Sequence, residues 1–231
     1  MIPILEALYE NENREVPGLV VAFGVSEKDP KIDKHPDDRD SFPDTVHHGV
    51  NTTLHFSQET ADKFVELFSS KKETCQSILE IGVWGAPHGA GNAGRSTEFL
   101  MDLKNEDTVY LGIDIEDRSE HCHFPEKNCF FFQSDSMDTE KIHAKIKEMG
   151  IEKFDFIFID GWHSINAVYH EWEHYVLPFL SEDGIVVFHD TNTHPGPFAL
   201  FEGVDDEVFE SEKYCLGNHF GLGAIWYRKD S

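Results

Sequence analysis

Carboxylates end two apolar segments in the second half of this chain. Asp160 closes the run Phe154–Asp160, and Asp190 closes the run Gly184–Asp190. Because neighbouring parallel strands end at the same edge of a sheet, these two carboxylates should lie close together. Two hard oxygen ligands with open positions favour Mg²⁺ or a similar divalent cation. The sequence therefore predicts a cation site at this edge.

Two histidines accompany these carboxylates. His189 directly precedes Asp190 and is a candidate third ligand, with Asn192 as the alternative. His163 follows Asp160 by three residues, and a histidine pKa near working pH suits a general base. A cation that binds a substrate hydroxyl lowers its pKa, and a nearby base takes the proton. Alternatively, His163 is a histidine at the start of a helix that has no functional role.

Three earlier strand ends carry groups that suit a nucleoside. Glycine backbone at Gly82 and Gly94 allows close approach of a ligand. Asp114 ends the second strand, where a carboxylate would accept hydrogen bonds from ribose hydroxyls. Asp135 follows the third strand, and it or its neighbours would meet the adenine amine. Any one of these acids is better explained as a turn former or helix cap, so the prediction depends on the whole set.

Alternating strands and helices are expected to position these groups. The expected strands are Ile78–Gly82, Val109–Asp114, Cys129–Gln133, Phe154–Asp160 and Gly184–Asp190, and the expected helices include Ser57–Ser70, Ser96–Leu103 and Ile165–Leu180. Such apolar runs separated by helices indicate a parallel sheet covered on both faces. Lys213–Leu216 and Gly221–Tyr227 predict an antiparallel hairpin. The expected fold class is therefore α/β, a Rossmann-like doubly wound sheet of parallel strands ending in an antiparallel C-terminal hairpin.

Length, composition and charge limit the domain organisation and the classes of binding partner. A chain of 231 residues suits one domain with an appendage, and we expect residues 1–55 to be an N-terminal appendage, a candidate lid, and 56–231 the main domain. The net charge of −25 argues against nucleic acid or an anionic membrane as a partner. The absence of an apolar run near about 18 residues and of a secretory signal predicts a cytoplasmic protein. The sequence is compatible with either a monomer or a homo-oligomer.

The block Phe154–Asp190 resembles the strand–helix–strand block of metal-dependent class I methyltransferases, which use S-adenosylmethionine (SAM). The subgroup contains macrolide and sugar O-methyltransferases, with cephalosporin-hydroxylase-like proteins nearby. Its pattern is I-D-G followed by a histidine, a long helix and then G-G-x-x-x-x-H-D. Asp160 and His163 match the first part, and the second part matches with Asp183 in place of the first glycine. The resemblance covers about residues 56–231.

The loop after the first strand resembles motif I of the same superfamily. It begins at Glu80-Ile81-Gly82 and ends at Gly94-Arg95-Ser96-Thr97, around the insert Trp84–Ala93. The resemblance implies a seven-stranded, SAM-dependent O-methyltransferase that uses Mg²⁺ or another divalent cation and a small-molecule hydroxyl acceptor, sugar or polyketide-like. The cofactor-binding residues are then expected to be Glu80, Gly82, Gly94, Ser96, Asp114, Asp135 and Asp160. The implied metal ligands are Asp160, His189 and Asp190, and the implied catalytic base is His163.

Two alternative functions share this fold class. Gly89-x-Gly91-x-x-Gly94 matches the dinucleotide fingerprint, with Asp114 at the position of a ribose-binding acid, which favours an NAD(P)-dependent oxidoreductase. The first fingerprint glycine should directly follow the strand, yet Gly89 stands seven residues after Gly82. These carboxylates would also repel the negative charges of a pyrophosphate, whereas SAM carries a sulfonium cation and no phosphate. A catalytically inactive SAM-fold binding protein is the other alternative.

Three further motifs match a known site only in part. A P-loop would need lysine where Arg95 stands. His170-Glu-Trp-Glu-His174 is a literal H-E-x-x-H zinc motif, but its histidines fall opposite the apolar stripe of the same helix and are expected to meet solvent. The cluster His121-Cys122-His123 with Cys129 matches no standard zinc spacing. None of these displaces the methyltransferase prediction.

Overall fold

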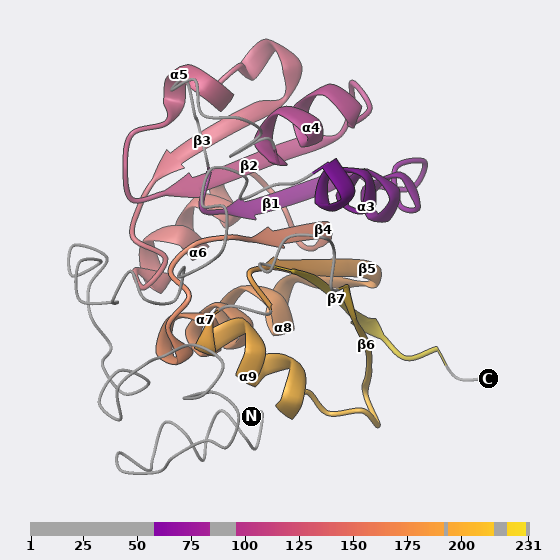
Figure 1. Cartoon of the computed structure of the whole chain (residues 1–231). Coiled ribbons are helices and arrows are strands. Elements are labelled where there is room, and N and C mark those ends of the chain that lie inside the picture. The colour runs from indigo at the N-terminus through magenta and orange to yellow at the C-terminus, as the bar shows by residue number, and fades with distance from the viewer. Residues whose placement is uncertain (1–57, 84–95, 192–193, 215–220, 230–231) are drawn as a thin grey trace.

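A seven-stranded sheet forms the centre of the protein in a computed structural model, which describes residues 58–83, 96–191, 194–214 and 221–229. The strand order is β3-β2-β1-β4-β5-β7-β6 (Figure 1). The strands are β1 (Ser77–Ile81), β2 (Val109–Asp114), β3 (Cys129–Gln133), β4 (Phe154–Ile159), β5 (Leu180–His189), β6 (Phe209–Tyr214) and β7 (Leu222–Tyr227). Strands β1 to β5 pair in parallel, and β7 runs antiparallel between β5 and β6. This confirms the expected parallel sheet with its antiparallel C-terminal hairpin.

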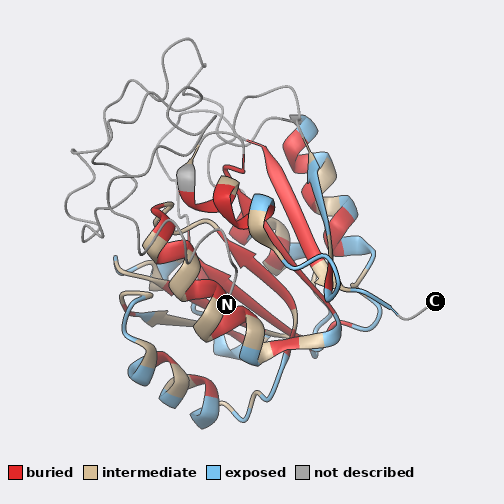
Figure 2. Ribbon diagram, turned by 90° about the horizontal axis from the view of Figure 1, so that it is seen from below, coloured by how far each residue is buried: buried red, intermediate tan, exposed pale blue. Residues whose placement is uncertain are grey.

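Helices cover both faces of the sheet. They are α3 (Gln58–Ser69), α4 (Ser96–Leu103), α5 (Ser119–Cys122), α6 (Thr139–Glu148), α7 (Ile165–Glu171), α8 (Leu177–Phe179) and α9 (Pro195–Gly203). Phe64 of α3 and Leu100 of α4 belong to the apolar cluster on one face, and Ile142 of α6 and Val168 of α7 belong to the cluster on the other. Figure 2 shows the buried strands between these helices. No helix in the described ranges is long and apolar enough to cross a bilayer.

Side-chain alternation in β4 explains why the strand is apolar from Phe156 to Ile159. Phe156 and Phe158 pack into the cluster beneath α3, while Ile157 and Ile159 point to the opposite cluster. Phe64 meets the ring of Phe158 edge-on at 4.8 Å between centroids. A strand segment buried on both faces needs apolar residues at successive positions, and this buried segment leads directly into Asp160.

The helix expected over Ile165–Leu180 is interrupted in the structure. Its middle, Trp172–Val176, is π-helical and joins α7 to the short α8. Strand β5 already begins at Leu180, four residues before the expected start at Gly184, because Leu180 pairs with Phe154 across a register shift in the β4–β5 ladder. The π-helical turn begins directly after Glu171, a buried residue that lies behind the candidate site.

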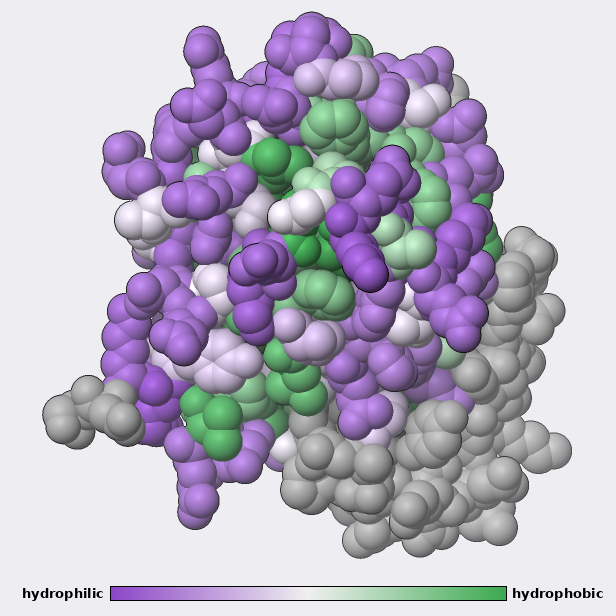
Figure 3. All heavy atoms as spheres, turned by 180° about the vertical axis from the view of Figure 1, so that it is seen from behind, coloured by the Kyte–Doolittle hydropathy of each residue, from purple (hydrophilic) through white to green (hydrophobic). Residues whose placement is uncertain are grey.

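The C-terminal hairpin also begins earlier than expected. Strand β6 starts at Phe209 instead of Lys213, and α9 fills residues 195–203. Charged residues conceal β6 in the sequence because it is an edge strand with one exposed face. The surface seen in Figure 3 is mostly hydrophilic, as the composition predicts. The expected appendage, residues 1–55, lies outside the described residues.

Candidate functional site

The ends of β4 and β5 lie side by side and bring two carboxylates together. Ile159 pairs with Phe188, so Asp160 and Asp190 follow at the same edge of the sheet. The Nδ1 atom of His189 lies 3.1 Å from Asp160 Oδ1 and 3.2 Å from Asp190 Oδ1. One ligand atom from each of these three residues lies within 4.8 Å of the others. The structure therefore brings together the three residues predicted to bind a cation.

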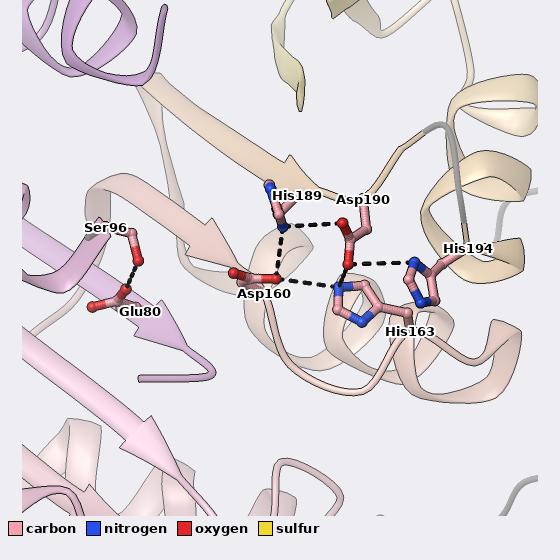
Figure 4. A network of polar contacts seen from close by, with 7 residues as sticks. All are labelled: Glu80, Ser96, Asp160, His163, His189, Asp190 and His194. Atoms are coloured by element: carbon pink, nitrogen blue, oxygen red, sulfur yellow. Dashed lines mark hydrogen bonds and ion pairs between the residues drawn. The ribbon is translucent and has the colours of Figure 1, made fainter. Parts of the chain in front are cut away.

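Two further imidazoles, those of His163 and His194, lie on the other side of Asp190. His163 Nε2 is 3.3 Å from Asp160 Oδ1 and 3.4 Å from Asp190 Oδ2. His194 Nδ1 is 3.3 Å from Asp190 Oδ2, and its ring lies 4.6 Å from that of His163 between centroids. Figure 4 shows these side chains converging from three segments of the chain. Sequence reasoning missed His194, although it stands four residues after Asp190 and directly before α9.

Two unusual backbone conformations shape this edge. Asp190 has a φ of +60°, a left-handed conformation that is uncommon outside glycine and is found at functional sites. Gly82 has a φ of +87°, and a Cβ atom there would lie 2.2 Å from the carbonyl oxygen of Asp160. Gly82 thus lets the end of β1 approach the end of β4 closely. Gly82 follows the last residue of β1, and its contact with a ligand stays a prediction.

The charges of the site stabilise one another. Burial by itself would raise the pKa of Asp160, but His189 and His163 hold that pKa well below its usual range. Burial works to lower the pKa of His163, and the carboxylates of Asp190 and Asp160 outweigh it, so the pKa is raised. Before any cation binds, the arrangement therefore favours an imidazolium at His163 between two carboxylates.

The donor atoms fit a divalent cation. With metal–ligand distances of about 2.1 Å, adjacent ligand atoms stand about 3.0 Å apart in octahedral and about 3.4 Å apart in tetrahedral geometry. The separations from His189 Nδ1 to the two carboxylates, 3.1 and 3.2 Å, lie in this range. Asp190 Oδ1 is buried and makes no hydrogen bond within the described part of the chain. An oxygen of this kind suits a metal ligand.

Glu80 and Ser96 contact each other at the start of α4. Ser96 Oγ donates a hydrogen bond of 2.7 Å to Glu80, and the hydroxyl of Tyr110 donates to the other carboxylate oxygen. Burial raises the pKa of Glu80 to about 7, although these hydrogen bonds work in the opposite direction. The carboxylate is fully buried, so its evident effect is to fasten the start of α4 to β1 and β2.

The other predicted nucleoside contacts lie at the same edge of the sheet. Asp114 ends β2 and accepts a hydrogen bond from the backbone N–H of Glu116, and Asp135 accepts one from the N–H of Met137. Both acids are partly exposed and both also shape local turns. Gly94, the insert Trp84–Ala93 and Asn192 lie outside the described residues. The predicted roles of Asp114 and Asp135 thus remain predictions.

The H-E-x-x-H helix has a different organisation from the one expected. His170 Nε2 lies 2.9 Å from the hydroxyl of Thr139, and the carbonyl of His174 lies 2.8 Å from His143 Nε2. Both histidines are partly buried beside α6, so the expectation that they meet solvent holds only in part. Among the described residues, the clusters that could hold a metal ion include neither histidine.

Glu171, the glutamate of that motif, is a buried residue that sequence reasoning missed. Its side chain is fully buried, and neither carboxyl oxygen has a hydrogen-bond partner in the described ranges. A Cβ on Gly161 would lie 3.3 Å from Glu171 Oε1, so the carboxyl lies directly behind the loop that follows Asp160. Burial raises the pKa of Glu171 to about 8.

Comparison with known proteins supports a methyltransferase. Residues 79–191 match the family model Methyltransf_24, described as a methyltransferase domain. A comparison with curated proteins found no match.

Three solved structures illustrate the shared fold. The MycE methyltransferase of the mycinamycin biosynthetic pathway, in complex with Mg and SAH, is 16% identical with a TM-score of 0.53, and the match covers 76% of this chain and 53% of MycE. CalS11, a TDP-rhamnose 3'-O-methyltransferase of calicheamicin biosynthesis, is 12% identical with a TM-score of 0.54, covering 91% of this chain and 99% of CalS11. A methyltransferase from Geobacter sulfurreducens is 12% identical with a TM-score of 0.51, and the match covers 79% of this chain and 88% of the Geobacter protein.

The structural matches and the family match support different conclusions. The chain spans about half the length of MycE, and identities this low show the fold alone. The family match adds sequence evidence over β1 to β5, including Asp160 and Asp190. Residues 79–191 are therefore similar in sequence to a methyltransferase domain, and the seven-stranded sheet has the fold of the solved methyltransferases.

Proposed function

We propose that this chain is a SAM-dependent, divalent-cation-assisted O-methyltransferase that acts on a hydroxyl of a sugar or polyketide-like small molecule. The observation that supports this most is the convergence of Asp160, His189 and Asp190 at the ends of β4 and β5. MycE, described in complex with Mg, SAH and mycinamycin VI, and CalS11, described as acting on TDP-rhamnose, make an acceptor of this class the natural one to test.

Asp160, His189 and Asp190 would hold the cation. When bound, the cation would lower the pKa of an acceptor hydroxyl. His163 would then take the proton through Nε2, which lies between the two carboxylates at 3.3 and 3.4 Å. Those carboxylates stabilise the resulting imidazolium, which is the physical reason that the pKa of His163 is raised.

The methyl donor would lie across the ends of β1, β2 and β3. Gly82 would allow the methionine moiety to approach the backbone, Asp114 would bind the ribose, and Asp135 would meet the adenine, as proposed from the sequence. Glu80 and Ser96 would position the start of α4 through their mutual hydrogen bond. SAM supplies an electrophilic methyl group when bound, and aligning the two reactants would provide much of the rate enhancement.

Asparagine variants of the two carboxylates test this proposal. Asp160→Asn and Asp190→Asn should abolish Mg²⁺-dependent formation of SAH with TDP-sugars and macrolide aglycones as the acceptor panel. SAM binding should persist in Asp190→Asn, and a Glu120→Gln variant, altered on the exposed α5, serves as the control. Full turnover in either asparagine variant, or turnover that is independent of any divalent cation, would overturn the assignment of the cation site.

A further inference from the structure

We propose that His163, Asp190 and His194 form a second cation site that prefers a zinc-like transition ion to Mg²⁺. Its occupation would block the general base of the proposed reaction. The inhibitory consequence depends on the proposed function, whereas binding of the ion does not.

The two oxygens of Asp190 serve different sets of donors. Oδ1 lies 3.2 Å from His189 Nδ1, on the side of the first cation site. Oδ2 lies 3.4 Å from His163 Nε2 and 3.3 Å from His194 Nδ1. These spacings again match adjacent ligands about 3.0 to 3.4 Å apart around one ion. A carboxylate placed in this way can bridge two ions, with one oxygen for each (Figure 4).

The backbone holds His194 beside His163. The N–H of His194 donates to the carbonyl of Asp190 at 3.1 Å, and the N–H of Gly196 donates to the carbonyl of His163 at 3.0 Å. A Cβ on Gly196 would lie 2.5 Å from the carbonyl oxygen of Ser164, so only glycine permits this approach. The start of α9 is therefore fastened both to the end of β5 and to the loop that carries His163.

Buried polar atoms point into this site. His163 Nε2 is buried and makes no hydrogen bond of good geometry within the described ranges, although the carboxylates lie nearby. The side chain of Asp190 is only 8% exposed. Because burial of polar atoms without hydrogen bonds is costly, such atoms call for a binding partner. A cation at this position would take the Nε2 lone pair of His163 and would replace its two long contacts with the carboxylates.

The donor types determine which ion the second site prefers. Two imidazole nitrogens and one carboxylate suit Zn²⁺, Co²⁺ and Fe²⁺, whereas Mg²⁺ takes oxygen ligands. The first site has the opposite balance, with two carboxylates and one imidazole. When the Nε2 lone pair of His163 is donated to an ion, it cannot accept a proton. A transition ion would therefore inhibit the reaction that Mg²⁺ supports.

Equilibrium dialysis of the full chain against Zn²⁺, followed by metal analysis, tests the site without relying on activity. His194→Ala should bind one equivalent of Zn²⁺ fewer than the wild type and should retain its Mg²⁺ affinity. Asp160→Asn should retain the equivalent that His194→Ala loses. Glu120→Gln, which alters an exposed residue of α5 outside the site, should match the wild type. Circular dichroism verifies that each variant is folded, and His194→Asn is the conservative replacement if His194→Ala is not.

Two results would overturn the second site. One is an unchanged Zn²⁺ stoichiometry in His194→Ala and His194→Asn. The other is complete loss of Zn²⁺ binding in folded Asp160→Asn, which would indicate a single shared site.

Activity then tests the inhibitory consequence. Zn²⁺ added to the Mg²⁺-loaded wild type should half-inhibit methyl transfer at a concentration at least about tenfold lower than in His194→Ala, because removal of a metal-site group typically weakens affinity by that factor or more. Equal inhibition of both proteins would refute the block of His163. A wild type without methyl transfer to any acceptor would refute the proposed function, while the dialysis result would still decide whether the second site exists.

Discussion

Glu171 shows where side-chain periodicity stops being informative. The apolar stripe of its helix includes Val168 and Trp172, both buried as predicted. Glu171 lies at the border of that stripe, and the π-helical turn that begins at Trp172 follows it directly. Regular helical spacing does not anticipate such a turn, so the sequence could not predict that this carboxyl would be buried behind Gly161.

The raised pKa of Glu171 gives a pH-dependent stability. Its folded pKa of about 8 exceeds the ordinary 4.5, so its contribution is fully present below about pH 4.5 and is lost as the pH rises through about 8. Glu171→Gln should therefore be more stable than the wild type at pH 9, by about 4 to 5 kcal/mol, and within about 1 kcal/mol of it at pH 5. Urea unfolding at both pH values measures this.

Glu173 provides the matched control for that measurement. It is a partly exposed glutamate two residues away, so Glu173→Gln makes the same substitution at a position that is not fully buried. A pH-independent effect of Glu171→Gln would show that burial does not keep this carboxyl protonated.

His163 is the residue on which the proposed proton transfer depends. His163→Asn should lower kcat by about 10²- to 10⁴-fold, the usual contribution of a general base, with a small effect on the KM for SAM. His121→Ala, outside the site, should leave both constants unchanged. Steady-state kinetics decide the matter, and a kcat of His163→Asn within twofold of the wild type would exclude His163 as the base.

Among the elements, strands β1 to β5 follow from the sequence within a few residues at their ends. Continuous apolar runs such as Ile185-Val-Val-Phe188 in β5 are typical of strands buried on both faces. Strand β6 is less evident because its edge position permits exposed charges such as Glu210 and Lys213. Local rules therefore predicted the parallel core better than the C-terminal edge.

The close approach of β1 to β4 yields a prediction for Gly82. Gly82→Ala combines a left-handed φ of +87° with a Cβ only 2.2 Å from the Asp160 carbonyl oxygen, so it should cost about 3 kcal/mol or more and weaken SAM binding. Gly150 has a φ of +70°, and a Cβ there would meet no atom within 4 Å, so Gly150→Ala should cost only about 1 to 2 kcal/mol. Thermal unfolding compares them, and equal losses would exclude the steric contribution.

At the scale of the whole molecule, the sheet topology assembles the site from distant segments. The ends of β4 and β5 are neighbours, so the sequence could predict that Asp160 and Asp190 meet. It could not place His194, because that position depends on how Gly196 packs against the His163 loop. Packing between α7 and α9 has no sequence signature, whereas buried parallel strands are marked by continuous apolar runs.

The net charge of −25 separates the two cofactor classes. A sulfonium cation is attracted by the carboxylates at the ends of β1 to β4, whereas a pyrophosphate would be repelled by them. Raising the salt concentration should therefore weaken SAM binding modestly by screening this attraction. Titrations at low and high ionic strength test this, and tighter SAM binding at high salt would contradict it.

The most direct test of the central claim is calorimetric titration of the full chain with SAM and with NADH, each with and without Mg²⁺. The account predicts saturable binding of SAM and none of NADH. Tight binding of NADH with no binding of SAM would contradict it.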